Sequence, residues 1–296
     1  MHLGTLRTSI ETPPSGWSGA RAVCRSSAPY DTVKSLLPRR SSVPVSDPAG
    51  DSEAVGLPRD PAPRISVIIP SWNEASTLPG LLETLRHQTV SDFEIILADS
   101  GSTDATAEVA ASFGIRVSPG RRMGPAEGRN RGARLARSDI LVFMDADCLV
   151  PPVLLEQVVK ALGDLTVIGG ATLFRPLEGT APERLLFFLA NAYQRATIAW
   201  GWPHNAGFCF FFRRSAFDQL GGMREDMLLN ETHDVALRSR NLGRFVSLPV
   251  AVETSVRRFR RNGFMKTVLH EYLGSTILYY LTKQSPATVF RPEPVR

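Results

Sequence analysis

Two aspartates one residue apart follow a short apolar run in the middle of the chain. The run covers 140–144 (ILVFM), and Asp145 and Asp147 come directly after it. Two carboxylates this close repel one another unless a cation or a shared proton offsets their charge. Mg²⁺ and Mn²⁺ prefer oxygen ligands, and Mg²⁺ is commonly held by one or two carboxylates together with substrate phosphates. The pair therefore predicts a divalent metal site that bridges to a phosphate-bearing substrate.

Three further polar clusters carry groups that could bind or react. They are 70–74 (PSWNE), 99–104 (DSGSTD) and 231–234 (ETHD). The first two follow the apolar runs 65–69 and 93–98, which are typical of buried strands. Open α/β sheets bind their ligands beyond the C-terminal ends of the strands. We therefore expect these clusters to meet the aspartate pair at one edge of a sheet.

The elements that must position these clusters alternate between strand and helix patterns. Over about the first eighty ordered residues this order predicts a right-handed, mostly parallel central sheet with helices on both faces, an α/β fold. The expected strands are 65–69, 93–98, 115–117, 140–144, 166–168 (ended by Gly169 and Gly170), 208–212 and 245–248. The expected helices are 78–87, 105–112, 129–137, 152–162, 183–200, 215–220, 232–241 and 263–283.

Composition suits a soluble globular protein with a basic surface. The chain has 296 residues, of which 43% are hydrophobic and 21% are charged, and its formal net charge is +5. This excess suits phosphorylated substrates or an anionic membrane surface. It is too small and too dispersed to indicate a nucleic-acid partner, so we expect none.

The chain divides by composition into an arm, a core and a tail. Residues 1–63 are rich in Pro, Ser and Arg without a helical or strand period, which predicts a disordered arm. A tail without a fixed role is the favoured interpretation of this arm. A targeting peptide and a mis-assigned start codon are the alternatives. We expect one domain over 64–255, in which 64–150 has the strand–helix order of a nucleotide-binding half. A basic strip and an amphipathic helix would follow over 256–296.

Several sequence features favour a cytoplasmic protein. No uninterrupted apolar stretch reaches the roughly 18 residues of a spanning helix, and the N-terminus lacks the apolar core of a secretory signal. Cys24, Cys148 and Cys209 are too few and too widely spaced for a disulfide framework or a zinc site. We expect a reducing compartment. The basic tail leaves contact with the cytoplasmic face of the membrane open as an alternative to a location free of the membrane.

Two common nucleotide-binding motifs are absent. No Gly-x-Gly-x-x-Gly follows the first expected strand, and no Gly-x4-Gly-Lys-Ser/Thr occurs in the chain. These absences disfavour a dinucleotide Rossmann site and a P-loop.

Taken together, the clusters resemble the family 2 inverting glycosyltransferases of GT-A fold. The resemblance covers 65–248, and it rests on the order and spacing of the motifs rather than on any one of them. It implies a GT-A-type single domain in which 151–255 is the acceptor half. Such a domain would move a sugar from a nucleotide-diphosphate donor, a UDP- or GDP-sugar, to an acceptor hydroxyl with inversion. The matching segments are 70–74 (PSWNE), 99–104 (DSGSTD), 128–132 (GRNRG), 145–147 (DAD, for the family's DXD) and 232–237 (THDVAL).

By this resemblance, two loops hold the nucleoside of the donor. Pro70, Asn73 and Glu74 would line the nucleotide pocket. Asp99 would accept a hydrogen bond from an N–H of the base, which in this family is typically uracil or guanine. Ser100 stands where the family usually has a second aspartate, so the base stays open.

The resemblance also assigns the residues around the diphosphate. Asp147 would be the direct metal ligand, and Asp145 would reach the metal or the ribose, with Mg²⁺ or Mn²⁺ as the cofactor. Arg129 would approach the donor phosphates, and Arg257 and Arg258 would close over them as a lid. A solvated basic surface is the alternative interpretation of these arginines.

Inversion requires a general base on the side of the sugar opposite the diphosphate. The family places this acid at the start of a helix, where the matching residue is Asp234. Glu231, one helical turn away, is the second candidate. His233 replaces the usual acidic neighbour and could tune Asp234, take the base role itself or be structural.

The acceptor stays broad: a hydroxyl of a glycan or a lipid, or a lipid phosphate. Residues 207–214 resemble the strand beside the acceptor site, and Trp200 and Trp202 would either stack on the acceptor or form aromatic core. The basic strip and the helix over 269–281 could rest on an anionic bilayer or pack on the domain.

Two other functions are disfavoured by the sequence. A sugar-phosphate nucleotidyltransferase would need a Gly-rich loop with Arg and Lys after the first strand, and 70–74 has neither. A non-catalytic sugar-nucleotide binding protein would not need to retain both Asp147 and Asp234.

Overall fold

The computed structural model describes residues 62–263, 266–267 and 273–284. The arm expected over 1–63 lies almost wholly outside the described residues, as do Cys24 and parts of the helix expected over 263–283. Within the described part of the chain, no helix is both long enough and apolar enough to cross a bilayer.

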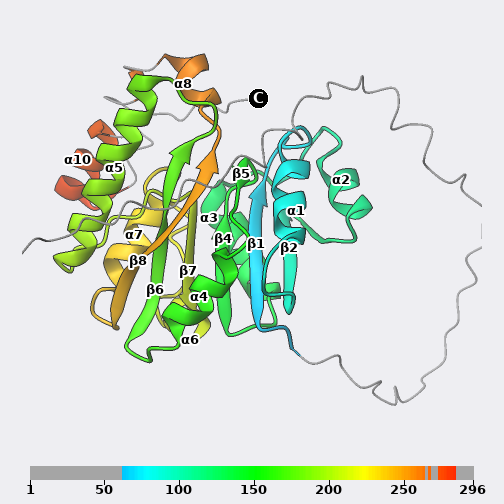
Figure 1. The fold of residues 1–296 in the computed structure, drawn as a ribbon, viewed down its shortest axis with the longest axis horizontal. Helices are drawn as coiled ribbons and strands as arrows, with labels where there is room; N and C mark the ends of the chain where they lie inside the picture. Colours follow the sequence, from blue (N-terminus) through cyan, green and yellow to red (C-terminus); the bar gives the residue numbers. More distant parts are fainter. Residues whose placement is uncertain (1–61, 264–265, 268–272, 285–296) are drawn as a thin grey trace, which may run out of the picture. The chain divides into compact units, whose positions relative to one another are not determined.

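An eight-stranded sheet forms the centre of the domain, in the order β3-β2-β1-β4-β7-β6-β8-β5 (Figure 1). The strands are β1 (Ile65–Ser71), β2 (Phe93–Asp99), β3 (Arg116–Pro119), β4 (Ile140–Met144), β5 (Cys148–Leu149), β6 (Val167–Pro176), β7 (Cys209–Arg213) and β8 (Arg244–Thr254). The helices are α1 (Leu78–Arg86), α2 (Thr106–Ser112), α3 (Pro125–Leu135), α4 (Leu154–Leu162), α5 (Ala181–Ala199), α6 (Arg214–Gln219), α7 (Glu231–Ser239), α8 (Arg257–Asn262) and α10 (Ser275–Thr282).

The sheet has a parallel half and a mixed half. Strands β3, β2, β1 and β4 are parallel to one another. Strand β7 runs antiparallel to β4 and β6, whereas β6 and β8 are parallel to one another, and β5 is antiparallel to β8. The predicted α/β fold is confirmed, and its parallel part coincides with the half expected to bind the nucleotide.

Each face of the sheet has its own core because side chains alternate along a strand. Val67 of β1 packs in one cluster with the apolar sides of α1 and α4. Ile68, the next residue, packs in a second cluster with α3, α7 and the phenylalanines Phe143 and Phe210. Helices therefore cover both faces, as the strand–helix alternation predicted.

Strand β6 is longer than the sequence suggested. Gly169 and Gly170 were expected to end it after 166–168, but β6 continues to Pro176. A Cβ atom at Gly169 would lie 2.7 Å from the Phe211 carbonyl oxygen, and one at Gly170 would lie 2.5 Å from the Val246 carbonyl oxygen. These glycines therefore permit close approach of the neighbouring strands rather than ending the strand.

The C-terminal ends of the parallel strands bring the polar clusters together. Ser71 at the end of β1 is in register with Asp99 at the end of β2, and β4 lies on the other side of β1. Immediately after β4, the Asp145 amide donates a hydrogen bond to the Phe208 carbonyl at 3.0 Å. The parallel half thus meets the mixed half at the aspartate pair.

Candidate active site

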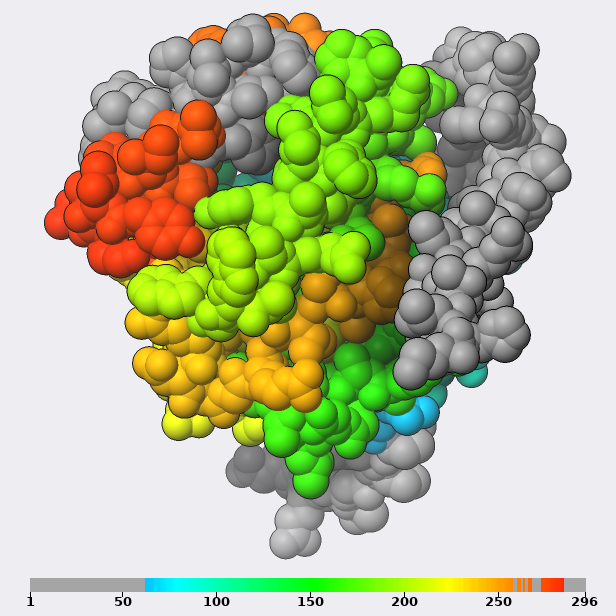
Figure 2. Space-filling model, turned by 60° about the vertical axis from the view of Figure 1, so that its left-hand side comes forward, coloured from blue at the N-terminus to red at the C-terminus, as the bar shows by residue number. Residues whose placement is uncertain are grey.

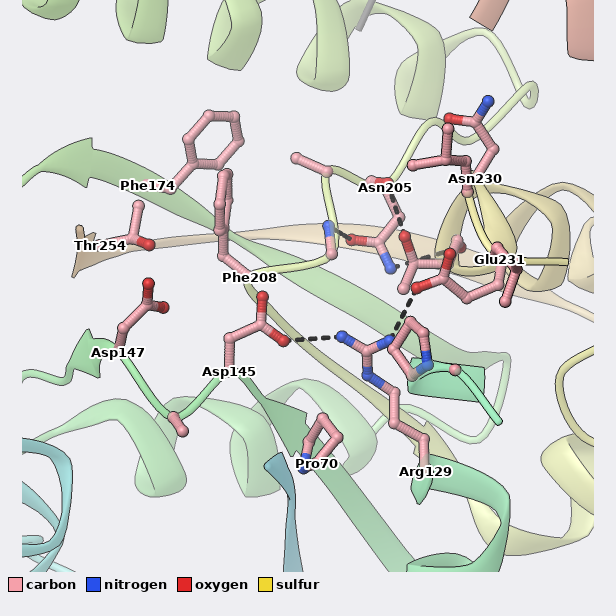
Figure 3. Close-up of a pocket in the computed structure, with 18 of the residues that line it drawn as sticks. Pro70, Arg129, Asp145, Asp147, Phe174, Asn205, Phe208, Asn230, Glu231 and Thr254 are labelled. Carbon is pink, nitrogen blue, oxygen red and sulfur yellow. Dashed lines mark hydrogen bonds and ion pairs between the residues drawn. The ribbon is translucent and has the colours of Figure 1, made fainter. Parts of the chain in front are cut away.

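A cavity of about 1390 Å³ lies at this edge of the sheet, with walls from both halves of the domain. Most small-molecule sites measure about 300–1,000 Å³, so this cavity is larger than the usual range. Figure 3 shows Asp145 and Asp147 on one side and Glu231 on the other. From the N-terminal half the lining residues are Pro70, Ser71, Trp72, Glu74, Ser100, Arg122, Met123, Gly124, Pro125, Arg129, Asp145, Ala146 and Asp147.

Two arginines offset the charge of the aspartate pair. The Arg129 guanidinium lies 2.7 Å from Asp145, and the Arg257 guanidinium lies 3.4 Å from Asp147. The repulsion predicted from the sequence is therefore relieved, at least in part, by cations that the chain itself supplies.

Arg129 connects the two sides of the cavity. It extends from α3, its exposed fraction is 3%, and it donates to Asp145 at 2.7 Å and to Glu231 at 2.8 Å (Figure 3). Burial by itself lowers the pKa of Arg129, but the two carboxylates outweigh it and raise the pKa above its ordinary value. The guanidinium is therefore a fixed positive charge between β4 and α7.

Helix α8 carries a second cation to the cavity. Arg257 donates to both carboxylate oxygens of Glu74, at 2.6 and 2.7 Å. The Thr77 hydroxyl also donates to Glu74, which holds this carboxylate beside the first helix. The sequence placed Glu74 and Arg257 in the site, and both line the cavity. The side chain of Arg258 lies outside the described residues.

Asn73 and Asp99 do not line the cavity; they shape its loops. Asn73 has a positive φ of 57°, and its side-chain oxygen accepts from the Thr103 amide at 2.8 Å. Asp99 accepts from the amides of Gly101 and Ser102 at 3.2 and 3.1 Å. Their oxygens are therefore engaged in holding the loops, and Ser100 is the neighbour that faces the cavity.

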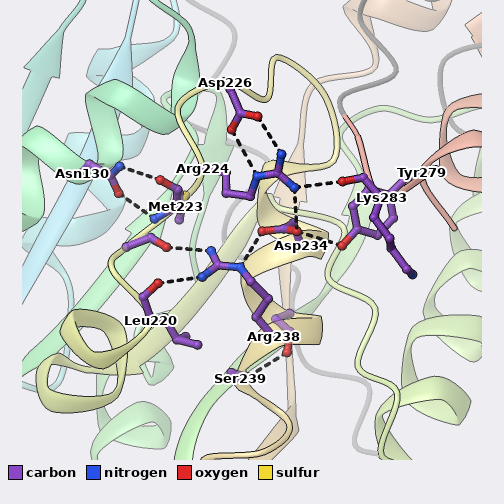
Figure 4. Close-up of polar contacts among 12 residues, drawn as sticks. Asn130, Leu220, Met223, Arg224, Asp226, Asp234, Arg238, Ser239, Tyr279 and Lys283 are labelled. Carbon is purple, nitrogen blue, oxygen red and sulfur yellow. Dashed lines mark hydrogen bonds and ion pairs between the residues drawn. The ribbon is translucent and has the colours of Figure 1, made fainter.

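Asp234 lies beneath the cavity rather than on its wall. It accepts from Arg238 at 2.7 Å and from the Tyr279 hydroxyl at 2.9 Å, and Arg224 lies 3.9 Å away (Figure 4). Its side chain is 4% exposed, and it is not among the residues that line the cavity. In this arrangement Asp234 joins α7 to α10 instead of facing a substrate.

Glu231, the first residue of α7, does line the cavity. The preceding Asn230 adopts the left-handed conformation with φ of 62°, which turns the chain into the helix at this point. Arg129 then engages Glu231 Oε1. The two acids of the predicted base segment are thus separated, with Glu231 at the cavity and Asp234 in the packing beneath it.

His233 is buried away from the cavity, whereas His204 lines it. Their rings lie 4.3 Å apart between centroids. Burial, and secondarily His204 and Lys283, lower the pKa of His233 to about 2; burial lowers the pKa of His204 to about 4. Both rings are neutral near pH 7, and the structure does not bring His233 to the base position.

Several lining residues were not identified from the sequence. Trp72 lies under the Arg122 guanidinium at 3.7 Å, and both line the cavity. The signal for Arg122 in the sequence was the basic turn that contains it. This turn ends at Gly124, which has a positive φ and precedes α3. Trp200 and Trp202 are exposed and do not line the cavity, so the interpretation of them as aromatic core is wrong.

The acids suit a metal that is shared with a substrate. Among the described residues, no group of three or more His, Cys, Asp or Glu side chains could hold a metal ion. Asp145 and Asp147, however, offer carboxylate oxygens at one point of the cavity. Mg²⁺ is usually held by one or two carboxylates together with substrate phosphates, so Asp145 and Asp147 fit this ion.

Comparison with known proteins matches the sequence to one family. The family model "Glycosyl transferase family 2" matches residues 66–221. Validoxylamine A glucosyltransferase of Streptomyces hygroscopicus subsp. jinggangensis is 38% identical over 109 residues, which are 33% of this chain and 25% of the relative. A PGL/p-HBAD biosynthesis glycosyltransferase of Mycobacterium tuberculosis is 39% identical over 94 residues, 29% of this chain and 36% of the relative. The chain thus spans about a quarter to a third of the length of these relatives.

Solved structures share the fold. The mannosyltransferase PcManGT from Pyrobaculum calidifontis, in complex with GDP-Man and Mn²⁺, has a TM-score of 0.59 and 24% identity, covering 73% of this chain and 65% of that one. S. aureus TarS 1-349 in complex with UDP-GlcNAc has a TM-score of 0.55 and 16% identity, covering 65% and 58%. The family model accounts for more than half of the 296 residues, and these neighbours share the GT-A-like architecture. The chain therefore belongs to glycosyl transferase family 2.

Proposed function

We propose that this protein transfers a sugar from a nucleoside diphosphate sugar to an acceptor hydroxyl, with inversion at the anomeric carbon. The observation that carries the proposal is one cavity in which Asp145 and Asp147 lie opposite Glu231, with Arg129 paired to both sides. Family membership supports sugar transfer. The complexes of structural neighbours with GDP-Man and UDP-GlcNAc support a nucleotide-sugar donor.

The donor would occupy the side of the cavity formed by the parallel half. Open α/β sheets bind ligands at this edge, and the loops after β1, β2 and β4 converge there. The Trp72 ring offers a flat surface to a nucleoside, and Arg122 adds positive charge beside it. Arg257, next to Glu74 and Asp147, supplies further positive charge where the diphosphate would lie.

Asp145 and Asp147 would hold Mg²⁺ or Mn²⁺ together with the donor diphosphate. When bound, the ion supplies positive charge that stabilises the negative charge of the departing diphosphate. Arg129 holds the Asp145 carboxylate in place from the opposite side.

Glu231 is the general base in this proposal. As the acceptor oxygen forms its bond to the anomeric carbon, its proton passes to the Glu231 carboxylate, and the bond from that carbon to the diphosphate breaks. The nucleoside diphosphate leaves on the opposite side, so the configuration inverts. Asp234 becomes a positioning residue, because its carboxylate is held by Arg238 and Tyr279 outside the cavity.

Glu231→Gln tests the base. Removal of a general base lowers a rate by about 10²- to 10⁴-fold. A thermal-shift screen of UDP- and GDP-sugars with Mn²⁺ first identifies the donor. With that donor, we expect Glu231→Gln to lose transfer activity by this factor and to retain donor binding. Glu108→Gln, at an exposed position on α2 outside the cavity lining, is the matched control and should keep full activity.

The same series separates the two acids of α7. Asp234→Asn should lower the melting temperature, because it weakens the contacts between α7 and α10. Full transfer by Glu231→Gln would exclude Glu231 as the base. The absence of a thermal shift with any nucleotide sugar would count against the whole proposal.

A further inference from the structure

The side of the cavity away from the aspartates is built from one stripe of each of two helices. The cavity-lining residues of α5 recur at helical spacing, and so do those in and just before α10. Figures 1 and 2 show the two helices beside one another. The stripe of α5 is Leu186, Phe187, Ala190 and Tyr193; that of α10 is Leu273, Thr276, Ile277 and Tyr280.

An aromatic cluster joins this wall to the acids. Phe174 lies 4.9 Å from Phe208 and 5.6 Å from Phe187 between ring centroids, and all three line the cavity. The Phe208 carbonyl accepts from the Asp145 amide. In Figure 3, Phe208 lies next to Asp145, and Phe174 lies next to Phe208. The apolar wall therefore begins at the point where the sugar would be transferred.

The wall carries no charge near neutral pH. None of the described α5 and α10 residues that line the cavity has a charged side chain. Burial keeps His204 neutral by lowering its pKa to about 4. Burial, with a smaller contribution from Tyr193, raises the pKa of Tyr280 to about 12, so its hydroxyl stays protonated.

The apolar surface continues from the cavity to the outside. Leu273 and Ile277 line the cavity and are nevertheless 53% and 51% exposed, so they lie at its mouth. A long apolar ligand could therefore extend out of the cavity along these helices.

We infer that the wall formed by α5 and α10 binds an acceptor whose reacting hydroxyl is carried on an apolar body, such as an alkyl, prenyl or aryl chain. The inference rests on the proposed function, because it places the hydroxyl at Glu231 and the apolar body along the two helices. A free oligosaccharide would lose the hydration of its many hydroxyls against a wall that returns few hydrogen bonds. An apolar chain gains on the same surface because its contact with water is removed.

The test is the binding of n-alkanols from butanol to decanol, measured by calorimetry on the full chain below the solubility limit of each alcohol. The affinity should rise by roughly two- to fourfold per added methylene. Sorbitol, a polar alcohol with the carbon count of hexanol, should bind far more weakly than hexanol. Equal affinities for sorbitol and hexanol, or no dependence on chain length, would overturn the inference.

Two pairs of variants locate the effect. Ile277→Gln should weaken decanol binding by roughly three- to tenfold, whereas Leu281→Gln, one turn further along α10, exposed and outside the lining, should not. Leu186→Gln and Leu189→Gln form the corresponding pair on α5. Equal effects of Ile277→Gln and Leu281→Gln would place alkanol binding elsewhere and contradict the inference.

The outcome is independent of the donor. Binding of nucleotide sugars without chain-length-dependent alkanol binding would refute the apolar acceptor and leave the proposed function intact. Alkanol binding without any nucleotide-sugar binding would support the apolar site and refute the proposed function. Binding of dodecanol carried in phosphatidylcholine vesicles is compared with binding of monomeric decanol. Tighter binding of the vesicle form indicates a membrane-borne acceptor, and tighter binding of the monomer indicates a soluble one. Either result supports an acceptor with an apolar body.

Discussion

Arg129 is the residue on which the charge balance of the cavity depends. It is buried, it is paired with an acid of each half of the domain, and its Nε lies buried without a partner among the described residues. A buried cation of this kind is tolerated because two carboxylates surround it. Removal of Arg129 would leave Asp145 and Glu231 without their shared cation. A loss of activity in such a variant could then come either from catalysis or from lower stability. The acids themselves are the sharper targets.

Asp147→Asn separates metal binding from folding. The substitution removes one of two neighbouring negative charges, and Arg257 retains its pair with Glu74. We therefore expect only a small change in the melting temperature of the unliganded protein, because Asn has nearly the shape of Asp and the substitution relieves the repulsion with Asp145. The additional thermal shift that Mn²⁺ produces with the donor should be lost.

Asp92→Asn, at an exposed position outside the cavity lining, is the control for this change and should retain the Mn²⁺-dependent shift. In the wild-type protein, EDTA should abolish the same shift. An Asp147→Asn protein with an unaltered Mn²⁺ response would exclude Asp147 as a metal ligand.

At the scale of elements, helix α7 carries two acids with different roles, and they lie three residues apart in its sequence. Its first residue, Glu231, lines the cavity, and Asp234 anchors the helix to Tyr279 of α10. Arg238 joins this anchor to the loop before α7 by donating to the carbonyls of Leu220 and Gly222 (Figure 4). The position of Glu231 therefore depends on contacts among residues that do not line the cavity.

Tyr279→Phe tests the anchor between α7 and α10. Tyr279 is 2% exposed, and its hydroxyl donates to Asp234 at 2.9 Å. Loss of a buried hydrogen bond to a charged group costs about 1.5–3 kcal/mol, so we expect a decrease of that order in the free energy of unfolding, measured by urea denaturation.

Tyr280→Phe is the matched comparison for this substitution. Tyr280 is only partly buried and lines the cavity. It should cost less stability than Tyr279→Phe. If both proteins had the stability of the wild type, the bond between Tyr279 and Asp234 would not be what holds α10.

At the scale of the whole molecule, the two neighbouring histidines make stability depend on pH. Burial lowers the pKa of His204 to about 4 and, with His204 and Lys283 contributing, that of His233 to about 2. An unfolded chain binds these protons near pH 6.5. Between the folded and unfolded pKa values the unfolded chain therefore carries more protons, so stability is complete above pH 6.5 and falls as the pH is lowered.

The expected slope approaches about 1.4 kcal/mol per pH unit for each histidine. Denaturation between pH 7.5 and 4.5 should show it, and His233→Phe, which keeps an aromatic ring against Tyr279 and Tyr280, should flatten it. His87→Gln, at an exposed position on the C-terminal side of α1, should leave the slope unaltered. An identical slope in His233→Phe would show that other groups govern the acid response.

The sequence by itself determined the fold class and the side of the cavity that carries the aspartate pair. The apolar runs before Pro70, Asp99 and Asp145 predicted buried parallel strands, and parallel strands bring their C-terminal ends to one edge. This argument needs only local pattern, and it placed Glu74, Asp145 and Asp147 at the cavity they line. Family membership was likewise recoverable, because motif order survives when individual residues change.

Only the tertiary structure decided which acid of α7 faces the cavity and what forms the opposite wall. Glu231 and Asp234 lie on neighbouring positions of one helix, so helical spacing could not separate them; the partners Arg129 and Tyr279, remote in sequence, do. In the same way, α5 and α10 are about eighty residues apart in the sequence. The apolar stripe of either helix, taken alone, has the pattern of an ordinary core-facing helix. Side chains acquire a shared cavity only when such distant elements pack together, and no local pattern records that packing.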